Sequence, residues 1–274
     1  MEITTWMIVV LGIFLFFLGS SVFSFLNVVI FRVPRKEEFI KTRSHCPGCN
    51  RLLTPLELIP VVSYACLGGK CRTCGSKIGW RDVAVEILGS CLCILSFWYY
   101  FQAPVESLAA GWFGDFYGRF LAALTAFAFF SVLTVITFID IDTMEILPGT
   151  VITVAVLGVI SYFTMPTVSI LSRVIGALCV SLPMYLLTLA IEGAFGGGDI
   201  KLMAAAGLFL GWKATLISTL LSFVFGGIWA VYLLLSKKKG RKDHFAFGPF
   251  LCMGMAVGLL YSSEIIDWYL GFLR

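Results

Sequence analysis

Long apolar segments recur through the whole chain, and they constrain its fold more than any other feature. Hydrophobic residues make up 59% of the 274 residues and charged residues only 13%, with a mean hydropathy of +0.96. A soluble domain of ordinary composition carries about 25% charged residues. Because a helix of roughly 20 apolar residues crosses the hydrocarbon core of a bilayer, the sequence predicts an all-α polytopic membrane protein.

Short polar stretches separate eight apolar segments, and we expect each segment to be a transmembrane helix. A cleaved signal peptide is the alternative for the first, but no basic region precedes it, it is too long, and it ends in basic residues. The segment 200–211 reaches only about 18 Å as a helix, which favours a tilted or half-submerged helix before a turn at Trp212-Lys213. The predicted spans are residues 3–31, 87–101, 119–139, 150–163, 170–191, 200–211, 214–235 and 245–272.

Basic residues gather in two stretches that orient the predicted spans. Residues 32–82 contain ten of the twenty Lys and Arg against four acids, which gives a formal charge of about +6, and residues 237–242 contain five more basic residues. The stretch 102–118 has two acids and no Lys or Arg, so we expect a loop on the opposite side. Because Lys and Arg are enriched in cytoplasmic loops, both termini are expected outside, and the basic stretches indicate a membrane orientation and not a nucleic-acid partner.

Two Cys-x-x-Cys pairs lie in the stretch 32–82, separated by 21 residues. A tight turn of this kind directs two thiolates at one tetrahedral zinc ion, and four thiolates leave no position open for a substrate. We therefore expect a structural zinc that folds the cytoplasmic loop, with two separate redox pairs as the alternative. Cys66 breaks the spacing, and His45 is not needed as a ligand. The predicted ligands are Cys46, Cys49, Cys71 and Cys74.

Two acids, Asp140 and Asp199, are expected at helix ends on the same cytoplasmic face, although 59 positions separate them. Carboxylates near lipid are unfavourable and usually mark a pathway or a catalytic site. Two carboxylates that share one proton can hydrolyse a peptide bond, since the ionised one deprotonates water while its protonated partner polarises the carbonyl. From the residues alone, two other interpretations stay open: hydrated acids at helix ends, and the coupling-ion site of a transporter.

Three glycines directly precede Asp199. Glycine can adopt backbone angles that a side chain forbids and lets another backbone come close, so we expect a substrate-proximal loop. Asp142 is two residues from Asp140 and cannot face the same partner on a helix; we expect Asp142 and Glu145 to be solvated or to lie around the reacting pair without belonging to it. The glycines of this loop are Gly196, Gly197 and Gly198.

Five blocks, in order along the chain, resemble the type IV prepilin peptidase family, and the similarity extends from about residue 18 to about residue 255. One departure is Pro148-Gly149, where the family usually has a Pro-Asp pair one residue earlier. The blocks are residues 24–34 (SFLNVVIFRVP), the Cys-x-x-Cys loop with residues 59–64 (IPVVSY), 138–142 (FIDID), 196–199 (GGGD) and 247–250 (FGPF).

The resemblance implies an intramembrane aspartic protease of the bacterial inner membrane, with Asp140 and Asp199 as the catalytic pair. It implies cleavage of the leaders of type IV prepilins and type II secretion pseudopilins at the cytoplasmic face, followed by N-methylation of the new N-terminal residue from S-adenosylmethionine. No motif marks a residue of the methyltransferase site. The expected organisation is a transmembrane helix at 1–31, a zinc-binding loop at 32–82, both within a methyltransferase part at 1–101, and a peptidase domain at 103–274.

Overall fold

The structure is a computed structural model that describes residues 2–38, 44–102, 110–191, 193–236 and 246–272. The chain divides into two compact units, Met1–Trp98 and Tyr99–Arg274, which are considered separately. The elements of the described residues are helices joined by turns, with only two isolated β-bridges and no strand. The predicted all-α fold is therefore confirmed.

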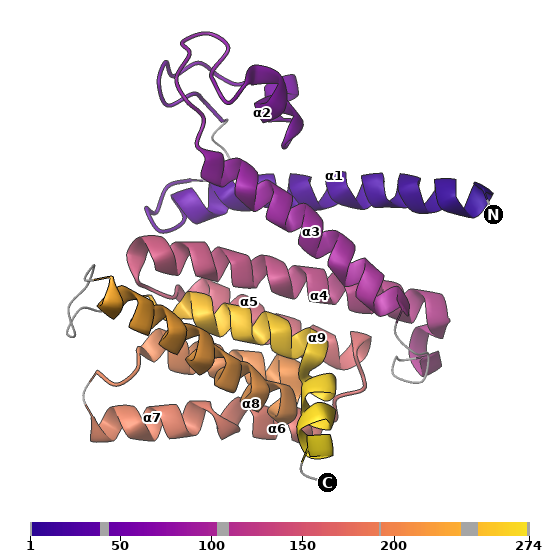
Figure 1. The fold of residues 1–274 in the computed structure, drawn as a ribbon, viewed down its shortest axis with the longest axis vertical. Coiled ribbons are helices and arrows are strands. Elements are labelled where there is room, and N and C mark those ends of the chain that lie inside the picture. Colours follow the sequence, from indigo (N-terminus) through magenta and orange to yellow (C-terminus); the bar gives the residue numbers. More distant parts are fainter. Residues whose placement is uncertain (1, 39–43, 103–109, 192, 237–245, 273–274) are drawn as a thin grey trace. The chain divides into compact units, whose positions relative to one another are not determined.

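The first unit contains the long helix α1 (Glu2–Arg32) and most of a second, α3 (Trp80–Gln102), and the two cross in Figure 1. Small residues bring them together: a Cβ on Gly19 would lie 2.6 Å from the carbonyl oxygen of Gly89. The Ser90 hydroxyl donates a hydrogen bond to the carbonyl of Phe16 at 3.0 Å. Packing of this kind, with small side chains and hydroxyl bonds, is typical of helices in membranes.

The chain between α1 and α3 folds mainly through turns, the short 3-10 helix η1 (Pro55–Leu58) and the helix α2 (Val62–Leu67). The Glu57 carboxylate organises one part of it, because it accepts bonds from the Arg51 guanidinium at 2.6 Å and from the Thr54 N–H at 2.9 Å. These contacts, that with Arg51 first, lower the pKa of Glu57 to about 2. A left-handed Gly68 (φ 58°) ends α2.

The second unit is a helical bundle in which α8 packs against α5, α6, α7 and α9, while α4 packs against α5 and α9 (Figure 1). Two glycines allow α6 and α8 to touch, since a Cβ on Gly176 would lie 2.6 Å from the carbonyl oxygen of Gly207. The rings of Phe129 and Phe209 stack with centroids 4.0 Å apart. The helices are α4 (Ala110–Thr143), α5 (Pro148–Thr164), α6 (Ile170–Cys179), α7 (Ser181–Ala190), α8 (Gly197–Leu235) and α9 (Gly248–Phe272).

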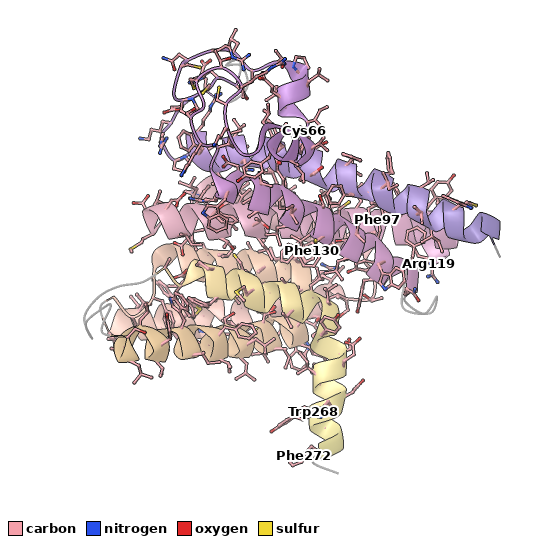
Figure 2. The ribbon with its side chains drawn as sticks, turned by 45° about the horizontal axis from the view of Figure 1, so that its top comes forward. Cys66, Phe97, Arg119, Phe130, Trp268 and Phe272 are labelled. Atoms are coloured by element: carbon pink, nitrogen blue, oxygen red, sulfur yellow. The ribbon has the colours of Figure 1, made fainter. Side chains whose placement is uncertain are left out.

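Apolar side chains cover the outside of this bundle as well as its core. Phe130 of α4 is buried, whereas Trp268 and Phe272 in the last turns of α9 are 73% and 83% exposed. These turns of α9 extend beyond the neighbouring helices of the unit in Figure 2. Leu220 and Ile228 on α8 are also exposed. In water such a surface would be unfavourable, so it indicates a lipid-facing exterior.

Six helical segments of the described chain are long and apolar enough to cross a membrane, which confirms a membrane protein; α5 is shorter. The predicted spans 200–211 and 214–235 are parts of the single helix α8, which breaks at Gly211 (φ 75°, ψ 167°), one residue before the predicted turn. The predicted loop 102–118 was too long, because α4 already begins at Ala110. The predicted count of eight spans stays a prediction, and the basic stretch 237–242 lies outside the described residues.

A buried arginine accompanies the break in α8. The guanidinium of Arg173 donates to the carbonyl oxygens of Leu208 at 2.8 Å and Phe209 at 3.1 Å, just before the break. It also donates to the carbonyl oxygens of Ser161 at 3.0 Å and Met165 at 3.1 Å, where α5 ends. The last carbonyls of a helix have no partner within it, so one side chain satisfies carbonyls at two helix ends.

Candidate active site

Asp140 and Asp199 line one cavity of the second unit, with a volume of about 450 Å³. This volume lies in the range of about 300–1,000 Å³ that is usual for ligand sites. The two acids, 59 positions apart in the sequence, therefore border the same cavity. Its other walls are the turn after α4 and the beginnings of α8 and α9: Met144, Glu145, Ile146, Gly196, Gly197, Gly198, Ala246 and Phe247.

Asp140 lies in the last turn of α4 and is only 5% exposed. Its Oδ2 accepts a hydrogen bond from the N–H of Gly248 at 2.9 Å. Gly248 is the first residue of α9, where N–H groups have no partner within the helix, and the following Pro249 has no N–H to offer. A carboxylate from a distant helix thus caps α9, and a Cβ on Gly248 would lie 2.6 Å from that Oδ2.

Asp199 lies in the first turn of α8 and is half-buried. Its carboxylate lies against Gly196, the residue just before the helix: a Cβ on Gly196 would lie 3.0 Å from Oδ2 of Asp199. The N-terminus of a helix presents N–H donors and the positive end of its dipole, worth about 0.3–1 kcal/mol to a nearby anion. Each carboxylate therefore lies beside a helix N-terminus at the cavity. Asp199 belongs to the first turn of α8, and Asp140, at the end of α4, accepts from the first N–H of α9.

The three glycines before Asp199 have ordinary backbone angles. Gly196 has φ −68° and ψ 139°, and Gly197 and Gly198 belong to the first turn of α8. The prediction that they adopt angles forbidden to other residues is wrong. What one of them provides is close packing, since a Cβ on Gly198 would lie 2.9 Å from Cβ of Ile146, whereas a Cβ on Gly197 would meet no described atom within 4 Å. Gly198 thus allows the start of α8 to pack closely against the turn after α4. Gly197 borders the cavity with free space beside it.

The turn after α4 contains Met144, whose positive φ of 55° reverses the chain. Its N–H donates to the carbonyl oxygen of Asp140 at 2.8 Å. As expected, Asp142 and Glu145 are exposed; Glu145 lies at the cavity wall. Pro148 then begins α5, at the helix position that proline favours.

A second group of side chains lies in the first unit. The four sulfur atoms of the two Cys-x-x-Cys pairs lie within 4.8 Å of one another, with Cys46 Sγ and Cys74 Sγ 3.7 Å apart. A tetrahedral zinc with Zn–S bonds of about 2.3 Å needs sulfur atoms about 3.8 Å apart, so the four thiols fit that ion. Cys66 is exposed on α2 (Figure 2). Neither Cys66 nor His45 belongs to the cluster.

The two turns that carry these cysteines are built alike. In each, the N–H of the first cysteine donates to the carbonyl five residues later, at 2.9 and 2.8 Å. A residue in the left-handed region follows the second cysteine in both. The equivalent residues are Cys46, Asn50 and Arg51 in the first turn, and Cys71, Gly75 and Ser76 in the second.

Ser76 joins the two turns. Its hydroxyl lies 3.4 Å from Cys46 Sγ and 3.1 Å from Cys74 Sγ. This contact lowers the pKa of the Cys74 thiol and that of the Cys46 thiol, the latter to about 6. The thiolate is the form of cysteine that binds a metal.

Two families of known proteins match the parts of the chain that contain the cysteine cluster and the two aspartates. The family profile described as Bacterial Peptidase A24 N-terminal domain matches residues 17–100, and that of the Type IV leader peptidase family matches residues 127–231. A prepilin leader peptidase/N-methyltransferase of Aeromonas hydrophila is 33% identical, over 93% of this chain and 92% of its own length. The protein of the same name from Bacillus subtilis (strain 168) is 30% identical, over 93% of this chain and 96% of its own. The chain belongs to the prepilin leader peptidase/N-methyltransferase family. No solved structure matches it.

Membership of the prepilin leader peptidase family favours an enzyme over a transporter as the interpretation of the two aspartates. Both lie inside the matched range 127–231, and the cysteines lie inside 17–100. Gly248 lies outside both ranges, and its sequence context indicates no role beyond its place in the block 247–250. The available signal was a Gly-Pro pair at the start of an apolar helix, which marks a helix N-terminus in need of an acceptor.

Proposed function

We propose that this protein is an intramembrane aspartic endopeptidase that removes the leaders of prepilins and pseudopilins and then N-methylates the exposed N-terminus. The observation that carries the peptidase is the cavity shared by Asp140 and Asp199. The family names carry the substrate class and the methyl transfer. Its partners are then the pilin-like substrates and the lipid of the bilayer.

Hydrolysis in this cavity needs one ionised and one protonated carboxylate. The ionised carboxylate removes a proton from water, and the oxygen attacks the peptide carbon while the protonated partner donates a hydrogen bond to the carbonyl oxygen. The C–N bond breaks as the leaving nitrogen takes up a proton. The Gly248 N–H fixes the orientation of the Asp140 carboxylate, and the open wall at Gly197 leaves room for an extended peptide.

Mass spectrometry of a prepilin incubated with the purified protein in detergent tests this function. The wild type should release the leader without any transmembrane gradient, which a coupling-ion transporter would not do. Asp142→Asn is the matched control, because Asp142 is exposed near the same helix end. Cleavage by Asp140→Asn or Asp199→Asn at the wild-type rate would contradict the assignment of the pair.

The proposed location is the bacterial inner membrane, with both termini outside and the two aspartates at the cytoplasmic face. The excess of Lys and Arg in residues 32–82 and 237–242 supports this orientation. A cysteine introduced at Lys238 should react with a reagent applied from the cytoplasmic side. Labelling of that cysteine only from outside would overturn the orientation.

The proposed division of labour assigns peptide cleavage to residues 103–274 and methyl transfer to residues 1–101. The boundary between the compact units, after Trp98, supports it. S-adenosylmethionine supplies a methyl group bound to a positively charged sulfur. Zinc, held by Cys46, Cys49, Cys71 and Cys74, would fold the loop, because four thiolates leave no open coordination position. Elemental analysis should find about one zinc per chain, and less than about half of that in fresh protein would contradict the site.

A further inference from the structure

A cavity of about 270 Å³ lies within the first unit, between the cysteine-bearing turns and the beginning of α3. Peptide cleavage uses none of its residues. Its walls combine the Asp82 and Glu86 carboxylates, the Arg51 guanidinium, the Tyr64 ring and the Ser24 hydroxyl. A concave site with a few convergent polar groups is the usual form of a small-molecule site.

Glu86 holds one wall of this cavity. Its Oε2 accepts a hydrogen bond from the N–H of Val61 at 2.8 Å, and the Ser24 hydroxyl also lies within hydrogen-bonding reach. Val61 has φ 62° and ψ −50°, which is an outlier for a β-branched residue. Such conformations persist where the surroundings impose them, and they gather at functional sites. The Glu86 carboxylate is therefore placed to fix the backbone just before α2 beside the cavity.

Arg51 provides a donor on the same cavity. Its Nη2 is paired with Glu57 at 2.6 Å, while its Nε is buried and has no hydrogen-bond partner in the part of the chain that the structure describes. The guanidinium also lies against Cys71, so the cavity and the cysteine cluster share a wall. Buried polar groups are normally hydrogen-bonded, so the contacts of this guanidinium with the described residues leave one of its donors unused.

We propose that this cavity binds S-adenosylmethionine. The proposal rests on the methyltransferase activity of the proposed function and assigns that activity a site. The ligand carries a sulfonium and an ammonium cation, hydroxyl donors on its ribose and one carboxylate. Glu86 and Asp82 attract the cations and accept from the hydroxyls, and Arg51 donates to the carboxylate. The Tyr64 ring offers a face to the sulfonium or the base. The residues present thus match the cations, the hydroxyls and the carboxylate of the ligand.

Equilibrium dialysis of purified full-length protein tests the site, with labelled S-adenosylmethionine as the probe. Glu86→Gln keeps the size of the side chain and removes its charge, so the affinity should fall by about tenfold or more. Glu37→Gln is the matched control: it removes the same charge from an exposed residue of the first unit outside the cavity wall, and its affinity should stay within about twofold of the wild type. Both variants should still cleave prepilin, because the proposed peptidase residues lie elsewhere.

A second ligand separates recognition of charge from general damage. S-adenosylhomocysteine has the same shape without the methyl group and without the positive charge on sulfur. Glu86→Gln should therefore weaken S-adenosylmethionine more than S-adenosylhomocysteine. Equal losses for the two ligands would overturn the proposal, as would a Glu86→Gln affinity for S-adenosylmethionine within about twofold of the wild type.

Ultraviolet cross-linking of labelled S-adenosylmethionine to the wild type gives a readout that needs no variant. Label on peptides that contain Tyr64 or residues 76–86 supports the site, and label confined to other peptides refutes it. A wild-type protein that cleaves prepilin but neither binds the ligand nor adds a methyl group would refute the methyltransferase function itself. Methylation with the label elsewhere would refute this site alone.

Discussion

Asp140 and Arg173 are both charged, both lie in the second unit and both are 5% exposed, yet their surroundings differ. Arg173 makes seven hydrogen bonds, six to carbonyl oxygens and one to the Ser161 hydroxyl. Asp140 accepts a bond from Gly248 and otherwise borders the cavity that Asp199 shares. Burial of a charge thus does not by itself mark a catalytic site.

What separates the two residues is whether their hydrogen-bonding capacity is met by the protein. A buried charge is tolerated when its donors are all engaged by the protein, and it then has nothing left for a substrate. A carboxylate held by a single helix N-terminus beside a second carboxylate keeps lone pairs for water and for a proton. We therefore expect substitutions of Arg173 to affect stability, and substitutions of the aspartates to affect cleavage.

The largest effect is expected from Asp140→Asn and Asp199→Asn. Loss of the proton transfer should lower the rate of prepilin cleavage by about 10³-fold or more. Stability should change little, because the amide oxygen of the asparagine in Asp140→Asn can still accept the bond from Gly248. Cleavage assays and thermal unfolding in detergent, on the same preparations, check both parts. A variant that lost stability and activity together would make Asp140 resemble Arg173.

The sequence predicted Asp140 and Asp199 because each motif is local. An acid behind glycines, or at the end of an apolar run, is visible without the fold, and the spacing of the four cysteines predicts their cluster in the same way. The helices were also predictable, since lipid requires long apolar segments. Their ends were less so: α4 begins at Ala110, inside the stretch 102–118 that was predicted as a loop, whereas the break in α8 at Gly211 lies one residue before the predicted turn.

The sequence could not predict Arg173 or the role of Gly248, because both depend on contacts between distant segments. A single arginine in an apolar run suggests a side chain that reaches for the interface, yet Arg173 reaches carbonyls near residues 161 and 208. Asp140 and Gly248 are 108 positions apart. The glycines at 196–198 were assigned to unusual angles, whereas Gly198 is required by its contact with Ile146.

Arg173→Met is expected to have the second largest effect. Methionine fills part of the space but donates no hydrogen bond, so the carbonyls at the end of α5 and before the break in α8 lose the hydrogen bonds that the guanidinium donates. The free energy of unfolding should fall by about 3 kcal/mol. Arg119→Met is the control, because Arg119 (Figure 2) donates one exposed bond, to the Phe101 carbonyl at 2.8 Å. Equal stability of the two variants in thermal or denaturant unfolding would show that the buried hydrogen bonds of Arg173 do not stabilise the fold.

Gly248→Ala should act on the catalytic side of the comparison. The added Cβ would lie 2.6 Å from Asp140 Oδ2, so the carboxylate has to move away from the N-terminus of α9. A displacement of about 1 Å can lower a rate by about 10²-fold, and we expect a loss of that order in kcat with a smaller change in stability. Gly271→Ala, in the same helix with no described atom within 4 Å of the new Cβ, should cleave normally; if it were equally slow, alanine in α9 and not the contact with Asp140 would be responsible.

The smallest effects should distinguish two adjacent glycines. Gly198→Ala places a Cβ 2.9 Å from Cβ of Ile146, and overpacking of this kind costs about 1 kcal/mol or more. Gly197→Ala meets no described atom within 4 Å and should leave the protein as stable, or more stable by about 0.5 kcal/mol, because alanine restricts the unfolded chain. Its Cβ narrows the cavity, so we expect a higher KM. Unfolding and cleavage kinetics of the two variants therefore test the same distinction as Arg173 and Asp140, now between adjacent residues. Gly198 is expected to serve packing, and Gly197 is expected to leave room for substrate. A KM unchanged in Gly197→Ala would mean that the peptide does not lie against this wall.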